Sequence, residues 1–175
     1  MITSEFSRPI ALDRIGLKEK SYEISADEKE RAALAKRLGI PAVNSFDATI
    51  RLRLTGGGGL VRLSGHIKAE LTQTCVVTLE PIPTSVEEDF TRVYSVEAGD
   101  EMAEVVVEMD EDDVPDPIEA GQIDMGDAAA EHLALAMDPF PRSAGAAFES
   151  PEEPPEEPEE KQSPFAGLAA LHKKE

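Results

Sequence analysis

The chain has 175 residues, of which 41% are hydrophobic, with 13 prolines and no tryptophan, so one domain of ordinary size is expected once the proline-rich end is discounted. Its formal charge of −19 arises in the second half: residues 1–95 hold 13 acidic and 13 basic residues, whereas residues 96–175 hold 23 acidic and 4 basic ones. This balance excludes nucleic-acid binding through bulk positive charge, because phosphate affinity needs clustered lysines and arginines, and any RNA contact must be local.

The single cysteine, Cys75, excludes an internal disulfide and favours a reducing compartment. The N-terminus lacks the basic and apolar regions of a signal peptide, and no apolar run approaches the roughly 18 residues that span a bilayer. We therefore expect a cytoplasmic protein.

The first elements are short. Alternating apolar residues predict edge strands at residues 9–12 and 21–24. Ser25 and Glu28 have the spacing of a capping box, and residues 26–38 carry apolar side chains at helical spacing. Gly39 is expected to end this amphipathic helix.

Residues 46–71 alternate between apolar and polar side chains on both sides of the glycines at 56–59, which predicts a long antiparallel hairpin with one buried face. Centring the turn on 57–58 pairs positions whose numbers sum to 115, so that apolar residues meet apolar partners or Gly65. The pairs are Leu54 with Val61, Leu52 with Leu63, Ala48 with Ile67 and Phe46 with Ala69. The second strand is expected to continue through Cys75, Val77 and Leu79.

A turn is predicted at Pro81 and Pro83, because proline cannot donate to a strand ladder. Strands at 86–93 and 105–107 and an acidic loop at 110–117 are expected to follow.

The second helix is predicted at 123–137, with Asp124 or Asp127 as its cap. Its buried stripe is expected to comprise Met125, Ala129, Leu133 and Ala136, and Pro139 and Pro141 are expected to end it.

The composition of the chain changes in its last part. Residues 146–162 are a Pro/Glu-rich linker with nothing to bury, which predicts a disordered, extended tether. Residues 163–175 begin with a Ser-Pro helix start and place Phe165, Leu168 and Leu171 on one helical face. This pattern is typical of a docking peptide, although a frayed terminus without a role has the same composition.

The sequence gives little support for an enzyme or for a metal site. One cysteine and three scattered histidines do not make a zinc site, and the acidic run at 108–119 lacks the glycine of a calcium loop. The glycine run lacks the Lys-Ser/Thr of a phosphate-binding loop. A hydrolase would have to use Asp124, Asp127 or His132, and we expect no activity, metal or cofactor.

The polar face of the hairpin is more informative. The same register places Arg53 opposite Arg62, Arg51 opposite Ser64, Thr49 opposite His66 and Asp47 opposite Lys68. Two facing arginines are mildly unfavourable, which suggests that something anionic covers them. Three interpretations remain open: an RNA backbone bound by Arg51, Arg53, Arg62 and Lys68, an internal partner in the acidic segment 101–111, or simple solvation.

Four stretches together resemble the YceD family, bacterial and plastid proteins linked to accumulation of large-subunit ribosomal RNA. They are Cys75-Val-Val-Thr-Leu-Glu-Pro81, Glu88-Asp-Phe-Thr-Arg-Val-Tyr94, the segment from Asp116-Pro-Ile-Glu through Gly121-Gln-Ile-Asp-Met-Gly to Asp138-Pro-Phe-Pro-Arg142, and Ser163-Pro-Phe-Ala-Gly-Leu-Ala-Ala-Leu171. The resemblance covers most of the chain from about residue 40. It implies a cytoplasmic, non-enzymatic factor that supports 23S rRNA processing or stability and hence assembly of the large ribosomal subunit.

The chain departs from this family at one position. Many relatives carry a Cys-x-x-Cys pair where this chain has Cys75 and Thr78. A metal or redox role for this strand is therefore not implied here.

These observations predict an α+β domain at 1–145, built on an antiparallel sheet with a long glycine-turn hairpin and two helices, followed by the linker and the C-terminal peptide. Two functions are carried forward. One is direct contact with precursor ribosomal RNA through the basic face of the hairpin. The other is a protein-binding adaptor whose C-terminal peptide docks on a large-subunit assembly protein, such as a ribosomal protein or an RNA-processing enzyme.

Overall fold

The computed structural model describes residues 4–55, 59–96 and 115–147. They form a five-stranded sheet, a two-stranded sheet and two α-helices, which confirms the predicted α+β class. The predicted strand at 105–107, the acidic segment 101–111, most of the linker and the C-terminal peptide with Phe165, Leu168 and Leu171 lie outside the described residues.

The five-stranded sheet has the order β2-β3-β4-β5-β6, with every neighbouring pair antiparallel except β5 and β6. Its strands are β2 (Lys20–Ser25), β3 (Ala42–Leu54), β4 (Leu60–Thr74), β5 (Pro81–Ser95) and β6 (Asp116–Pro117). The smaller sheet pairs β1 (Pro9–Ala11) with β7 (Gln122–Asp124). Short 3-10 turns at Leu12–Arg14 and Glu119–Gly121 connect these elements.

The hairpin of β3 and β4 has the predicted register. Leu54 pairs with Val61, Leu52 with Leu63, Ala48 with Ile67 and Phe46 with Ala69. One register shift between Val43 and Ser45 interrupts the ladder near the start of β3. Period-two patterning and the position of the glycine turn together determine this pairing, because a slip by one residue would move the whole apolar set to solvent and the turn excludes longer slips.

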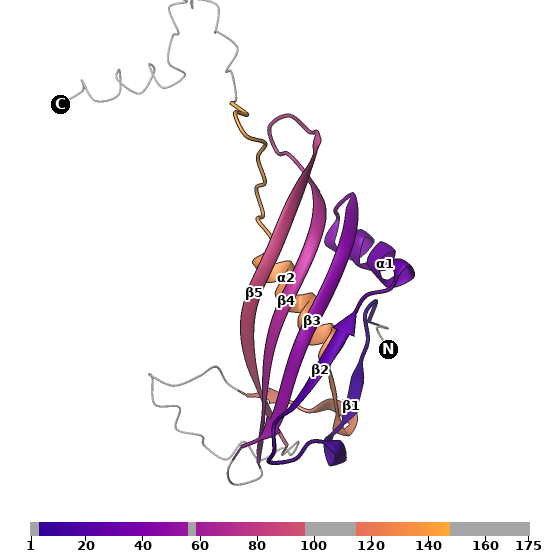
Figure 1. Cartoon of the computed structure of the whole chain (residues 1–175), viewed down its shortest axis with the longest axis vertical. Coiled ribbons are helices and arrows are strands. Elements are labelled where there is room, and N and C mark those ends of the chain that lie inside the picture. The colour runs from indigo at the N-terminus through magenta and orange to yellow at the C-terminus, as the bar shows by residue number, and fades with distance from the viewer. Residues whose placement is uncertain (1–3, 56–58, 97–114, 148–175) are drawn as a thin grey trace, which may run out of the picture.

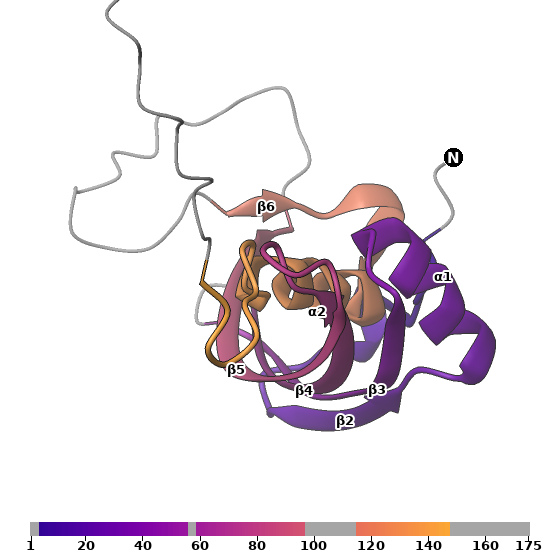
Figure 2. The same cartoon turned by 90° about the horizontal axis from the view of Figure 1, so that it is seen from above.

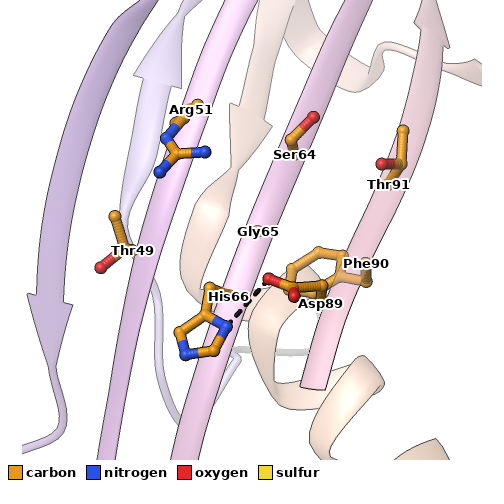
Figure 3. Close-up of a pocket in the computed structure, with 8 residues that line it drawn as sticks. All are labelled: Thr49, Arg51, Ser64, Gly65, His66, Asp89, Phe90 and Thr91. Carbon is orange, nitrogen blue, oxygen red and sulfur yellow. Dashed lines mark hydrogen bonds and ion pairs between the residues drawn. The ribbon is translucent and has the colours of Figure 1, made fainter. Parts of the chain in front are cut away.

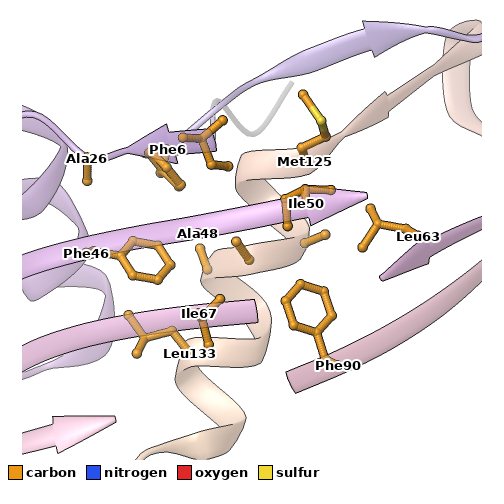
Figure 4. Close-up of a cluster of buried hydrophobic side chains, with 14 of the residues drawn as sticks. Phe6, Ala26, Phe46, Ala48, Ile50, Leu63, Ile67, Phe90, Met125 and Leu133 are labelled. Carbon is orange, nitrogen blue, oxygen red and sulfur yellow. The ribbon is translucent and has the colours of Figure 1, made fainter. Parts of the chain in front are cut away.

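Helix α2 (Met125–Ala136) lies on the concave side of the curved sheet, and Figures 1 and 2 show β3, β4 and β5 bending around it. The core lies between them and includes Phe46, Ile50, Leu63 and Leu133, all nearly inaccessible to solvent (Figure 4). Of the predicted helix stripe, Met125, Ala129 and Leu133 are buried and Ala136 is partly buried. Asp124 is the N-cap, one of the two residues predicted for that position.

Helix α1 (Glu28–Leu38) packs beside β3, and Gly39, with a φ of 67°, ends it as expected. Its predicted cap was wrong. The capping box joins Asp27 and Glu30, whereas Ser25 is the last residue of β2 and donates its hydroxyl to Asp47. Ser25 belongs to the sheet because its backbone pairs with Asp47 in the β2–β3 ladder.

The connection between β4 and β5 also differs from expectation. Strand β4 ends at Thr74, and residues 75–80 form a turn closed by hydrogen bonds from Cys75 N to Glu80 O and from Leu79 N to Cys75 O. Pro81 and Pro83 lie inside β5 and do not form the turn. Proline is tolerated there because, among the described residues, β5 pairs on its outer side only through Tyr94 and Ser95.

Within the acidic loop predicted at 110–117, Asp116 and Pro117 instead form β6, beside Tyr94 and Ser95. In the described part of the chain, no helix has the length and apolar character needed to cross a membrane.

Candidate nucleic-acid interface

The convex face of the sheet, opposite α2, carries no described helix (Figure 2). Its polar side chains form rungs across the strands. One rung comprises Ser25, Asp47, Lys68 and Glu87, and the next Glu23, Thr49, His66 and Asp89. Two further rungs comprise Ser21, Arg51, Ser64 and Thr91, then Arg53, Arg62 and Val93. Charge is thus sorted along the face, with mixed signs at one end and arginines at the other.

At the mixed end, basic side chains are paired with carboxylates of β5. Lys68 Nζ lies 3.0 Å from Glu87 Oε1. His66 Nδ1 lies 2.9 Å from Asp89 Oδ1, and its Nε2 lies 3.4 Å from Glu87 Oε1. The sequence placed Lys68 opposite Asp47 correctly, but the ion pair forms with the other neighbouring strand.

At the opposite end, three arginines are gathered on adjacent rungs; we call Arg51, Arg53 and Arg62 the arginine cluster. Arg53 lies directly opposite Arg62, and Arg51 follows on the next rung. Arg51 and Arg53 are exposed, and Arg62 is partly buried. Within the part of the chain that the structure describes, the side chains of Arg51 and Arg53 form no hydrogen bond or ion pair, whereas Arg62 has a partner.

A hollow of about 420 Å³ lies at the border between the two ends. It is lined by Arg51, by the hydroxyl residues Thr49, Ser64 and Thr91, by His66 with Asp89, and by Gly65 and Phe90 (Figure 3). We call it the sheet hollow. Because it combines one guanidinium with three hydroxyls, it offers donors for an anion and groups that can both donate and accept.

The structure therefore brings together three of the four predicted basic residues, Arg51, Arg53 and Arg62. It separates them from Lys68, which is bound to Glu87 two rungs from Arg51. Sequence reasoning missed the contribution of Thr91 and Asp89 from β5. The β4–β5 register could have placed them, because these strands pair at positions whose numbers sum to 155. This register was not assigned, because the turn expected at the prolines hid the start of β5.

The residues considered for hydrolysis are occupied by structural contacts. Asp124 accepts hydrogen bonds from Gly126 N and Asp127 N at the start of α2, and from Arg8 N and the Ser7 hydroxyl. Asp127 lies 3.4 Å from Arg37 Nη1.

His132, the third residue considered for hydrolysis, stacks on Phe90, with ring centroids 4.0 Å apart and planes inclined by 19°. Burial, reinforced by the nearby positive charge of Arg92, lowers the pKa of His132. Its ring therefore belongs to the packing between α2 and β5.

Cys75 lies at the end of β4 and is fully buried. Its Sγ accepts hydrogen bonds from Thr78 N at 3.4 Å and Ser143 N at 3.3 Å. Hydrogen bonds from Thr78, followed by those from Ser143, lower the pKa of the Cys75 thiol to about 6, against the opposing effect of burial. Among the described residues, no three His, Cys, Asp or Glu side chains are grouped to hold a metal ion.

The model of one protein family, described as large ribosomal RNA subunit accumulation protein YceD, matches residues 63–172. The match covers most of β4, all of β5, β6, β7 and α2, and continues to residue 172 within the C-terminal peptide. No curated protein and no solved structure matches the chain. Since the family model covers more than half of the sequence, the chain belongs to the YceD family, as its four motifs indicated.

Proposed function

We propose that this protein is a non-enzymatic, cytoplasmic factor that supports accumulation of 23S rRNA and assembly of the large ribosomal subunit by contacting precursor RNA directly. Family membership supports the process, since the family is described by accumulation of large-subunit ribosomal RNA. The arginine cluster supports the direct contact.

The observation that carries the proposal is that the exposed side chains of Arg51 and Arg53, on successive rungs of the convex face, have no ion-pair or hydrogen-bond partner within the described residues. Two neighbouring guanidinium groups without a described partner repel each other, and an anion that lies over both relieves this repulsion. A phosphate backbone supplies such anions, and each guanidinium can bind a phosphate through two hydrogen bonds. Because the second half of the chain has an excess of negative charge, it repels RNA, and the RNA contact is confined to the arginine cluster.

The test compares two charge-matched variants of the full chain. Arg51→Gln with Arg53→Gln removes two charges from the cluster, and Lys29→Gln with Lys36→Gln removes two exposed charges from α1. Binding to a transcribed precursor fragment is measured by fluorescence anisotropy over a series of salt concentrations. Each phosphate contact contributes roughly 0.7–0.9 to the slope of log K against log salt, so the first variant should lose affinity and one to two units of slope.

The α1 variant should keep both the affinity and the slope of the wild type. Equal losses in the two variants would mean that only net charge matters, and unchanged binding by the cluster variant would remove this face from RNA contact. In cells that lack the endogenous protein, the cluster variant should also fail to restore the level of large-subunit ribosomal RNA.

A second function, the protein-binding adaptor, is favoured by the extent of the family match. The matched region continues to residue 172 and so includes Phe165, Leu168 and Leu171. Replacing these three residues by alanine, with Lys173 and Lys174 kept, tests whether the peptide docks on a ribosomal protein or RNA-processing enzyme. Loss of co-purifying partners with RNA affinity intact would identify the adaptor, whereas the same set of partners would exclude the peptide as the docking element.

A further inference from the structure

The sheet hollow lies beside the arginine cluster and is lined by groups that suit a sugar–phosphate backbone better than a base. Arg51, Ser64 and Thr91 form one rung of the sheet, and Thr49 lies on the next rung (Figure 3). A hydroxyl can donate to a phosphate oxygen and can also donate to or accept from a ribose 2′-hydroxyl. The 2′-hydroxyl is the group that distinguishes RNA from DNA at such a site.

The described part of the same face offers little surface for stacking bases, because the one aromatic ring on its rungs, His66, is held by Asp89 and Glu87. The residues of the four rungs include no Phe, Tyr or Trp. Phe90 reaches the hollow, but it is only 7% exposed and its ring stacks on His132 behind the sheet. Proteins that bind single-stranded nucleic acid stack successive bases on several exposed aromatic side chains, and the described part of this face lacks such a series.

Carboxylates limit how far a nucleic acid can extend along the face. Asp89 borders the hollow, and Glu23, Asp47 and Glu87 lie on the same or the following rung. A phosphate strand that crosses Arg53, Arg62 and Arg51 would be repelled beyond the hollow. The area of the sheet that favours phosphate is therefore short. It crosses neighbouring β-strands, where it can contact backbone atoms of a nucleic acid.

We propose that the arginine cluster and the sheet hollow together bind the sugar–phosphate backbone of double-stranded RNA, with the hollow accepting a phosphate and an adjacent 2′-hydroxyl. In A-form RNA the wide minor groove exposes 2′-hydroxyls beside phosphates, which is the combination that a guanidinium surrounded by hydroxyls can recognise without reading sequence. This inference rests on the proposed function and adds the class of RNA that the site takes.

The experiment measures binding of the full chain to three probes of equal length at one salt concentration: an RNA duplex, the DNA duplex of the same sequence, and a single-stranded oligouridine. We expect the RNA duplex to bind about tenfold more tightly than the DNA duplex, a difference on the scale of one lost hydrogen bond. It should also bind more tightly than oligouridine, which has 2′-hydroxyls but lacks the fixed A-form arrangement of 2′-hydroxyls beside phosphates. If no probe binds, the proposed function itself fails. If oligouridine or the DNA duplex binds as tightly as the RNA duplex, the proposed function stands and this inference is overturned.

A pair of variants tests the hydroxyls. Ser64→Ala with Thr91→Ala should reduce the preference for RNA over DNA duplex, whereas Ser45→Ala with Ser85→Ala, which flank Glu70 outside the hollow, should leave it unchanged. Circular dichroism and thermal unfolding check that both variants fold. Because the probe comparison uses the wild-type chain, it can overturn the inference even if a variant does not fold.

Discussion

Gly65 on β4 and Phe90 on β5 are paired across the sheet, and the phenyl ring occupies the space where a side chain at Gly65 would be. A Cβ at Gly65 would lie 2.2 Å from Cε1 of Phe90. The ring itself is held from the other side by His132. The absence of a side chain at Gly65 thus allows Phe90 to pack between the floor of the sheet hollow and helix α2.

Gly65→Ala should therefore destabilise the domain. The added methyl must displace the Phe90 ring, and inserting a methyl group into a well-packed core costs about 1–3 kcal/mol. Urea unfolding followed by circular dichroism measures this difference. Gly65→Ala with Phe90→Leu is the control, because the smaller side chain makes room for the methyl and should make the alanine less costly than it is beside Phe90. An alanine that costs the same beside leucine would mean that this contact is not the cause.

Asp124→Ala should destabilise the start of α2. Its carboxylate accepts hydrogen bonds from Gly126 N, Asp127 N and Arg8 N, at distances of 3.0, 3.1 and 2.7 Å. Loss of a helix N-cap alone costs about 0.5–2 kcal/mol, and here the N-terminal segment also loses its attachment. Asp127→Ala is the matched control, since Asp127 is partly exposed and its pairing with Arg37 resembles surface ion pairs worth about 0–1 kcal/mol. Equal losses of unfolding free energy would contradict the special role of Asp124.

The β3–β4 hairpin shows how much of the fold could be predicted from the sequence alone. Strict alternation excludes a slip by one residue, and centring the turn on the glycines at 57–58 selects one of the registers that remain, so the facing of Arg53 and Arg62 followed from arithmetic. The second helix was also found, because Asp124 precedes a run with apolar residues at helical spacing, although it begins at Met125 and Ile123, predicted as its first residue, belongs to β7. These predictions succeeded because they depended on local periodicity.

The errors arose where tertiary contacts override local preference. The end of β4 at Thr74 could not be read from the pattern, because the turn after Cys75 is held by the distant Ser143 and Pro141. Pro81 was expected to form a turn with Pro83 and instead begins a strand at the sheet edge. The ion pair of Lys68 with Glu87 likewise depends on a third strand whose register was not assigned.

Cys75 should make stability depend on pH. Its pKa is lowered to about 6 in the folded chain from a reference value of 9.0, so between these values the unfolded chain binds more protons than the folded one. Stability due to this group is therefore fully present above the higher value and is lost as pH falls through the lower one. Unfolding free energy measured across this window should rise with pH more steeply for the wild type than for Cys75→Ser. Parallel curves would show that the thiol is not ionised in the folded chain.

His132 should add a second, more acidic dependence. Burial against Phe90, then the charge of Arg92, lowers its pKa from the reference value of 6.5, while Glu131 and Glu88 act in the opposite direction. The unfolded chain therefore takes up a proton at a higher pH than the folded chain does, and stability is lost as pH falls below 6.5 and through the folded pKa.

The measurement compares the wild type with His132→Gln, which keeps a polar side chain but cannot titrate, between roughly pH 5 and pH 8. Above the reference pKa the difference in unfolding free energy between the two proteins should be constant, because His132 is neutral in both states. Below it, the wild type should lose stability faster than the variant. If the variant loses stability at the same rate, protonation of His132 does not oppose folding, and the stacked ring must accept its charge without leaving Phe90.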